Sequence, residues 1–235
     1  MPFPSLDLDI ALDVMSGVVA LLVSSYAYRY NKLLTNSTLK FIGIGFIMLG
    51  VGLLIEAWAY SFVVFGIGDL STDRAFAIIT SALYEIMQMG AFFVLALGYV
   101  RSALGSRKIN SLNASALTAL AIPIVTTTGP GRLRDMLHFA REIWVVAEFL
   151  SIVFLAIVVL VGFLGYSETR HRFSLLVILS FILILAAQAL DLWTVLSISV
   201  RLDVLSSIVQ FAGFLTLLVF IIWRGRIGPA RETPQ

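Results

Sequence analysis

The run 41-FIGIGFIMLGVGLLIEAWAYSFVVFG-66 decides the class of fold. It is apolar along its whole length apart from Glu56 and a few small polar groups. About 20 mostly apolar residues are enough for a helix to cross the hydrocarbon core of a bilayer. A helix is also one of the few structures that pairs all its backbone polar groups without water. The run therefore predicts a membrane-spanning helix.

Further runs of the same kind surround it, and together they predict an all-α seven-transmembrane-helix bundle forming one domain over residues 1–235. Hydrophobic residues make up 60% of the chain and charged residues 13%, whereas a soluble domain has roughly 25% charged residues. The lipid bilayer is therefore the expected partner of most of the surface. Nucleic acid is not expected, because the positive charges are scattered in short loops. The predicted spans are about 8–28, 41–66, 75–100, 111–128, 140–165, 173–199 and 204–223.

The positive charges also predict the orientation, because lysine and arginine favour the cytoplasmic side of membrane proteins. Seven spans put eleven such residues on one side and five on the other, and the amino-terminal tail carries only Asp7 and Asp9. We expect a multi-pass protein of the cell membrane with its amino terminus outside and its carboxyl terminus in the cytoplasm. The eleven cytoplasmic residues are Arg29, Lys32, Lys40, Arg101, Arg107, Lys108, Arg170, Arg172, Arg224, Arg226 and Arg231.

The fourth span, 111–128, is the weakest of the seven because it is short and contains Pro123. A six-span alternative leaves it out, but it moves Arg170 and Arg172 to the outside and spoils the charge asymmetry. The segment 131–141 that follows is amphipathic with helical spacing. It either lies on the outer interface or extends the fifth helix outward.

Short polar patterns recur in the same order along the chain. The first and fifth spans share acid-x-x-Ser, the second and sixth share acid-x-Trp, and the third and seventh share Ser-x-x-x-polar. They predict a parallel repeat of three helices, one connecting helix and three helices, related by an axis along the membrane normal. Coincidence among serine-rich apolar helices is the alternative. The matched pairs are Asp13 with Glu148, Glu56 with Asp191, and Glu85 with Gln210.

This order of helices resembles that of the SWEET-type sugar transporters. The resemblance is one of topology alone, because that family has a Pro-Gln pair in each repeat. The only such pair here is Pro234-Gln235, in the carboxyl-terminal tail. We therefore do not assign the chain to that family.

Acidic residues inside the predicted spans are the candidates for function. A carboxylate at mid-bilayer costs roughly 2.5–3.5 kcal/mol, so these side chains are expected to face the bundle interior. At 1.5 Å per residue they all lie about 7–16 Å below the outer surface, whereas the inner halves of the spans are almost purely apolar. Polar neighbours at helical spacing complete a predicted ligand- or cation-binding set: Asp13, Glu56, Glu85, Gln88, Glu148, Gln188, Asp191 and Gln210.

No lysine or arginine lies deep within a predicted span to neutralise these acids. Like charges repel strongly in a low dielectric, so either protons or a bound cation must neutralise them. The cation is a hard metal ion with oxygen ligands, such as Mg²⁺ or Ca²⁺, or an amine-bearing ligand. The alternative is that protonated acids and amides only tie the helices together through hydrogen bonds.

Several cofactors are excluded because the sequence lacks the side chains that would bind them. Retinal needs a lysine in the last span, but the lysines are Lys32, Lys40 and Lys108, all in predicted cytoplasmic loops. A bis-histidine haem needs paired histidines inside spans, and the chain has only His138 and His171, near span edges. The chain has no cysteine and no recognisable catalytic motif. We therefore expect no retinal, no haem and no enzyme.

Three classes of function stay open. The first is a receptor-like or sensory protein that binds a cationic or polar ligand from outside and acts on a separate cytoplasmic or membrane partner protein. The second is an ion- or proton-coupled secondary transporter built on the repeat. The third is a structural or accessory subunit of a membrane complex. The almost purely apolar inner halves of the spans favour the receptor-like class. The repeat favours the transporter class.

Overall fold

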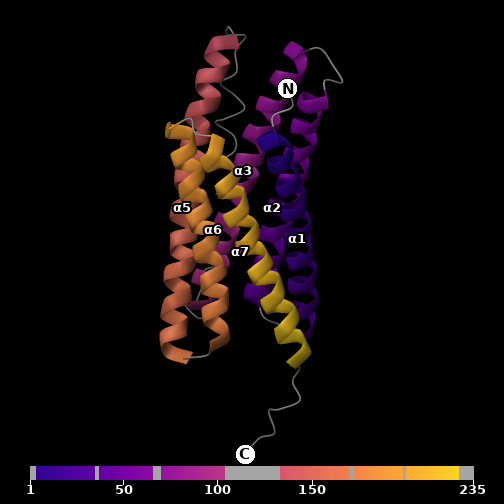
Figure 1. Ribbon diagram of the computed structural model, residues 1–235. Coiled ribbons are helices and arrows are strands. Elements are labelled where there is room, and N and C mark those ends of the chain that lie inside the picture. Colours follow the sequence, from indigo (N-terminus) through magenta and orange to yellow (C-terminus); the bar gives the residue numbers. More distant parts are fainter. Residues whose placement is uncertain are drawn as a thin grey trace, which may run out of the picture.

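The computed structural model describes residues 4–34, 37–65, 70–103, 133–169, 172–197 and 200–227, and all of these are helical (Figure 1). The all-α class is therefore confirmed for this part of the chain. The helices are α1 (Pro4–Leu34), α2 (Ser37–Phe65), α3 (Leu70–Ala103), α5 (Leu133–Thr169), α6 (Arg172–Ser197) and α7 (Val200–Ile227).

Each of these helices contains a stretch that is long and apolar enough to cross a membrane. The chain is thus a multi-pass membrane protein, and six of the seven predicted spans overlap helices of the structure. The predicted fourth span, 111–128, lies outside the described residues. The six stretches are Leu8–Lys32, Thr38–Phe62, Ile79–Ala103, Trp144–Tyr166, Leu175–Thr194 and Leu202–Trp223.

The start of α5 shows whether the amphipathic segment 131–141 lies on the interface or extends the fifth helix. The helix begins at Leu133 and has 37 residues, so it is about 55 Å long at 1.5 Å per residue. This exceeds the roughly 30 Å of a hydrocarbon core. The amphipathic residues from Leu133 onward therefore extend the fifth helix beyond its apolar part.

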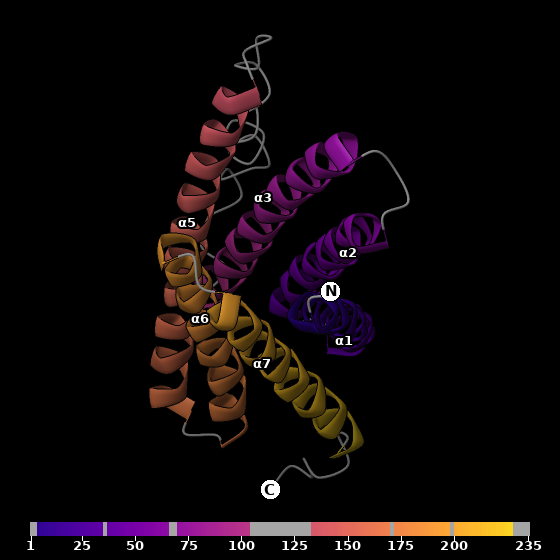
Figure 2. The ribbon, with the colours of Figure 1, turned by 45° about the horizontal axis from the view of Figure 1, so that its top comes forward.

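The helices form a closed ring in which each one contacts its neighbours in the order α1, α2, α3, α5, α6, α7 and back to α1 (Figure 2). Helices α1, α3, α5 and α7 run away from the end at which the chain begins, whereas α2 and α6 run back towards it (Figure 1). We call these the amino-terminal end and the opposite end of the bundle. Two neighbouring pairs, α3 with α5 and α7 with α1, are thus parallel.

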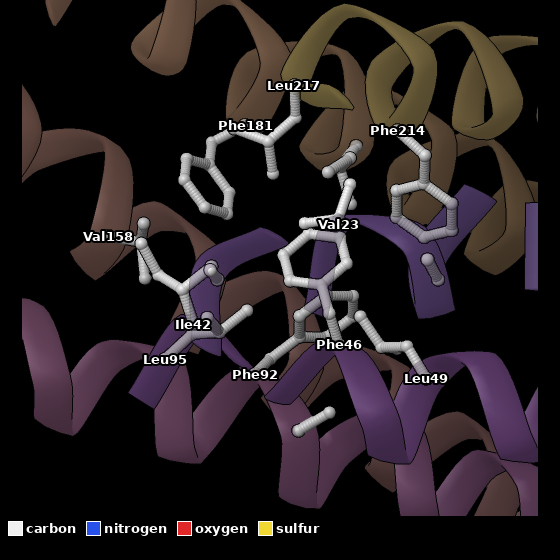
Figure 3. Packing of buried hydrophobic residues seen from close by; sticks show 14 of the residues in the cluster. Val23, Ile42, Phe46, Leu49, Phe92, Leu95, Val158, Phe181, Phe214 and Leu217 are labelled. Carbon is white, nitrogen blue, oxygen red and sulfur yellow. The ribbon is translucent and has the colours of Figure 1, made fainter. Parts of the chain in front are cut away.

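An apolar layer closes the centre of the ring, and every described helix contributes to it (Figure 3). Phe46 and Phe214 meet edge to face with ring centroids 5.5 Å apart, and Tyr99 meets Phe181 at 5.6 Å. Such aromatic contacts add to the dispersion energy of close packing. We call this layer the apolar seal, and its main members are Val23, Phe46, Phe92, Leu95, Val158, Phe181, Phe214 and Leu217.

Hydroxyl groups at the level of the seal are paired with the backbone. Ser24 donates to the carbonyl of Gly43, Ser180 to that of Leu176, and Thr216 to that of Ala212, at 2.7–2.8 Å. Paired in this way, a hydroxyl can sit in apolar surroundings at little cost. These residues therefore add no free polar group to the seal.

Candidate functional site

All eight predicted site residues lie in the half of the bundle towards the amino-terminal end, beyond the apolar seal. The side chains of Glu56, Glu85, Gln88, Glu148, Gln188 and Gln210 are buried, and those of Asp13 and Asp191 are half-buried. The five carboxyl groups act on one another electrostatically across α1, α2, α3, α5 and α6. We call these five residues, Asp13, Glu56, Glu85, Glu148 and Asp191, the acid layer.

Glu56 lies near the end of α2 and is 8% exposed. Its Oε1 accepts a hydrogen bond of 2.9 Å from the hydroxyl of Ser81 on α3. Its electrostatic neighbours are Asp13, Asp9 and Asp191. The bond to Ser81 therefore fixes the position of the carboxyl group but brings no positive charge to it.

Glu85 and Glu148 form a pair between α3 and α5, and their side chains are 3% and 2% exposed. A hydrogen bond joins the two carboxyl groups. Because an ionised carboxylate only accepts hydrogen bonds, such a bond requires a proton on one of the two groups. The second oxygen of each, Oε2, has no hydrogen-bond partner among the described residues.

Two glutamines lie one turn deeper than this pair. Gln88 Nε2 donates to Gln188 Oε1, which ties α3 to α6. Both side chains are almost completely buried, with exposed fractions of 1% and 0%. Within the described part of the chain, Gln88 Oε1, Gln188 Nε2 and the hydroxyl of the neighbouring buried Ser151 lack partners. Leaving a buried polar group without a hydrogen-bond partner costs about 1–3 kcal/mol. The groups at this level of the bundle can therefore still form hydrogen bonds with a ligand.

Aspartates form the outermost part of the polar region. Asp9 accepts a hydrogen bond of 2.6 Å from Ser207, which joins α1 to α7. Ser206 on α7 donates its hydroxyl to the carbonyl of Ala187 on α6 at 3.1 Å and also lies beside the carboxyl group of Asp191. Asp203 acts electrostatically on Asp13 and Asp191. Asp9, Asp13, Asp191 and Asp203 are all half-buried, so this aspartate group makes the amino-terminal end of the ring acidic.

Sequence reasoning missed three residues of this region. Asp203 was left in a loop because the predicted seventh span starts one residue later, although it lies in the first turn of α7. Ser207 was not among the predicted site residues, although its hydroxyl donates to Asp9. Tyr84 was not among the predicted site residues, but its hydroxyl accepts a hydrogen bond of 3.5 Å from Gln210. The helical spacing of Asp203 and Ser207, four residues apart, is the signal that pointed to a polar face there.

The chemistry of this region is that of oxygen ligands and protons. Over the described ranges, no group of three or more histidine, cysteine, aspartate or glutamate side chains is arranged to hold a metal ion. The charged side chains that act on the acid layer are themselves acids. Carboxyl, amide and hydroxyl groups that lack a base can bind a cation or share protons.

Comparison with known proteins found no relative of this chain. No protein-family model, no curated protein and no solved structure matches the chain.

Proposed function

We propose that this membrane protein is receptor-like or sensory, and that it binds a proton, a cation or a small polar or cationic ligand entering from the amino-terminal end of the bundle. The observation that carries the proposal is the acid layer, which lies on one side of the apolar seal with three of its five carboxyl groups buried and with other acids beside them. A ligand bound there shifts helix positions if it prefers one arrangement of the ring over another. The seal transmits that shift to a cytoplasmic or membrane partner protein while it keeps the ligand out of the cytoplasm.

The chain lacks cysteine, so single introduced cysteines test this proposal directly. We expect Asp203→Cys to react at least about tenfold faster with a cationic than with an anionic methanethiosulfonate reagent, because the remaining aspartates focus positive charge there. Leu217→Cys, in the seal and 1% exposed, should react with neither reagent from either side. The measurement is the rate of modification in sealed vesicles of each orientation.

Ser5→Cys supplies the reference for the intrinsic preference of each reagent on the same side of the membrane. If Asp203→Cys shows the same ratio of rates as Ser5→Cys, or does not react at all, the polar region is closed to ligands. The accessory-subunit function then becomes the better explanation of the acids.

We also propose the predicted orientation, with the amino terminus outside the cell membrane, and a seventh span between α3 and α5. These two helices lie side by side and run in the same direction: Glu85 pairs with Glu148, and further along both helices Phe93 meets Phe154 at 5.2 Å. The chain that leaves α3 at Ala103 must therefore return to the amino-terminal end before α5 begins at Leu133. A crossing at 111–128 supplies that return.

Cysteine labelling in intact cells checks the orientation and the seventh span together. We expect Ser5→Cys and Arg132→Cys to react with a membrane-impermeant maleimide, and Ser106→Cys to react only after the cells are opened. The reverse pattern refutes the orientation. Labelling of Ser106→Cys and Arg132→Cys on the same side refutes the seventh span.

A secondary transporter is the second candidate, and the repeat supports it. Ser81 lies against Glu56, and Ser206, the matching residue of the second half, lies against Asp191, although the hydroxyl of Ser206 donates to the carbonyl of Ala187. Burial follows the same pairing, since Val23 and Val158 are both 0% exposed, whereas Trp58 and Trp193 are 56% and 62% exposed. The ring order is also what a two-fold axis along the bundle would produce, because it repeats after three helices.

Such two-fold halves are typical of carriers that rock around a central site. The cysteine experiment separates the two candidates, since a carrier must expose its centre to both sides in turn. Reaction of Leu217→Cys with a reagent added from the cytoplasmic side would favour transport over the receptor-like function.

A further inference from the structure

The unpartnered buried polar side-chain atoms of the described residues are concentrated in one sector of the ring, where α3, α5 and α6 meet. Glu85 and Glu148 form its outer level, and Gln88 and Ser151, each three residues further along the same helix, form its inner level. Three residues are close to one helical turn, so each pair of neighbours shares a helix face. Gln188 closes the sector from α6 through its bond with Gln88.

Four unpartnered oxygens belong to this sector: Glu85 Oε2, Glu148 Oε2, Gln88 Oε1 and Ser151 Oγ. All four side chains are at most 3% exposed. The fifth unpartnered atom, Gln188 Nε2, is a hydrogen-bond donor and cannot hold a cation. The sector therefore has more unpartnered oxygen acceptors than unpartnered donors. A positively charged ligand would supply the partner that these oxygens lack.

The charge of the sector fixes the charge of its ligand. The hydrogen bond between Glu85 and Glu148 requires a proton on one of the two carboxyl groups, and release of the other proton leaves one negative charge on the pair. Gln88 and Ser151 add oxygens but no charge. A lone buried charge is strongly unfavourable, and one monovalent cation balances it, whereas a divalent ion would leave an excess of positive charge.

We infer that Glu85, Glu148, Gln88 and Ser151 form a buried site for one compact monovalent cation, of the size of Na⁺ or NH₄⁺. The inference rests on the proposed function and deepens it, because it names the ligand class and the sector of the ring that takes it. The half-buried aspartates Asp9, Asp13 and Asp203 lie towards the amino-terminal end, where a negative potential draws cations in.

The other half of the ring offers a matched comparison. In the repeat pairing, Ser16 on α1 corresponds to Ser151 on α5, and both are buried, at 2% and 0% exposed. Gly213 and Leu53 stand at the positions that correspond to Gln88 and Gln188. The second sector therefore lacks the amide pair, and the chain has this oxygen set in only one of its two matched sectors.

Cation dependence of thermal stability tests the site. Purified protein is melted in N-methyl-D-glucamine chloride, whose cation is too large for a buried site, and then with NaCl or NH₄Cl replacing it at constant ionic strength. We expect a saturable rise of the melting temperature, about 4 °C at ten times the Kd. A rise with NaCl identifies a spherical ion, and a rise with NH₄Cl alone identifies an ammonium-type ligand.

Glu148→Gln keeps the shape of the side chain, and Ser151→Ala removes one oxygen. Each should weaken the cation response at least about tenfold in concentration, whereas Ser16→Ala should keep it. A melting temperature indifferent to both salts overturns the site, as does an equal loss of response in Ser151→Ala and Ser16→Ala. Neither result affects the cysteine rates at Asp203, so the proposed function is judged separately.

Discussion

Phe46→Ala is expected to destabilise the protein by about 3 kcal/mol and to lower its melting temperature by about 9 °C. The ring of Phe46 is 0% exposed and lies in the apolar seal against Phe214 (Figure 3). Truncation leaves a cavity in the centre of the ring, which neighbouring side chains from several helices cannot fill without moving. Thermal unfolding of the purified protein in detergent measures the effect.

Phe163→Ala is the matched control, because Phe163 on α5 is 44% exposed and contacts the surroundings of the bundle. Its removal should change the melting temperature by no more than about 2 °C, since lipid or detergent replaces the lost contacts. If both variants melt at the same temperature, the seal is not a close-packed core. The proposal that the seal closes the site towards the opposite end of the bundle would then be wrong.

Gly50→Val is expected to separate α1 from α2 and to cost about 2–3 kcal/mol. A Cβ atom at this position would lie 2.8 Å from Leu21 Cγ and 2.9 Å from the carbonyl oxygen of Gly17. The side chain of Leu21 can turn aside, but the backbone of α1 can move only if the two helices separate. Small residues allow this close approach of membrane helices.

Gly165→Val provides the control for the Gly50 substitution, because no atom lies within 4 Å of the Cβ position there. We expect a loss of stability at Gly50 and almost none at Gly165, measured by thermal unfolding under the same conditions. Equal stability of the two variants would show that α1 and α2 do not approach as closely as the structure has them.

Much of the fold could be read from the chain because the bilayer restricts it so strongly. A run such as 41–66 has no stable state in lipid other than a helix, so the spans and the all-α class followed from apolar length. The inward position of the acids followed from the cost of a carboxylate in lipid. Glu56, Glu85 and Glu148 are indeed buried inside the ring.

The partners of these residues could not be predicted in the same way. Gln88 and Gln188 are 100 residues apart in sequence, and Asp9 and Ser207 are 198 apart. Helical periodicity fixes which face a residue occupies, but it carries no information about which helix that face meets. For the same reason the sequence treated all eight site residues as one layer, whereas their unpartnered atoms gather where α3, α5 and α6 meet.

The sequence by itself determined the apolar helices, the depth of the acids and the order of the matched patterns in the two halves. Each of these depends on transfer between water and lipid or on spacing along one helix, and both are local properties. The tertiary structure decided the closed ring, the contact of Glu85 with Glu148 and the sealing of one half by Phe46 and Phe214. These depend on how side-chain shapes from different helices fit together, and that fit exists only once the helices have packed.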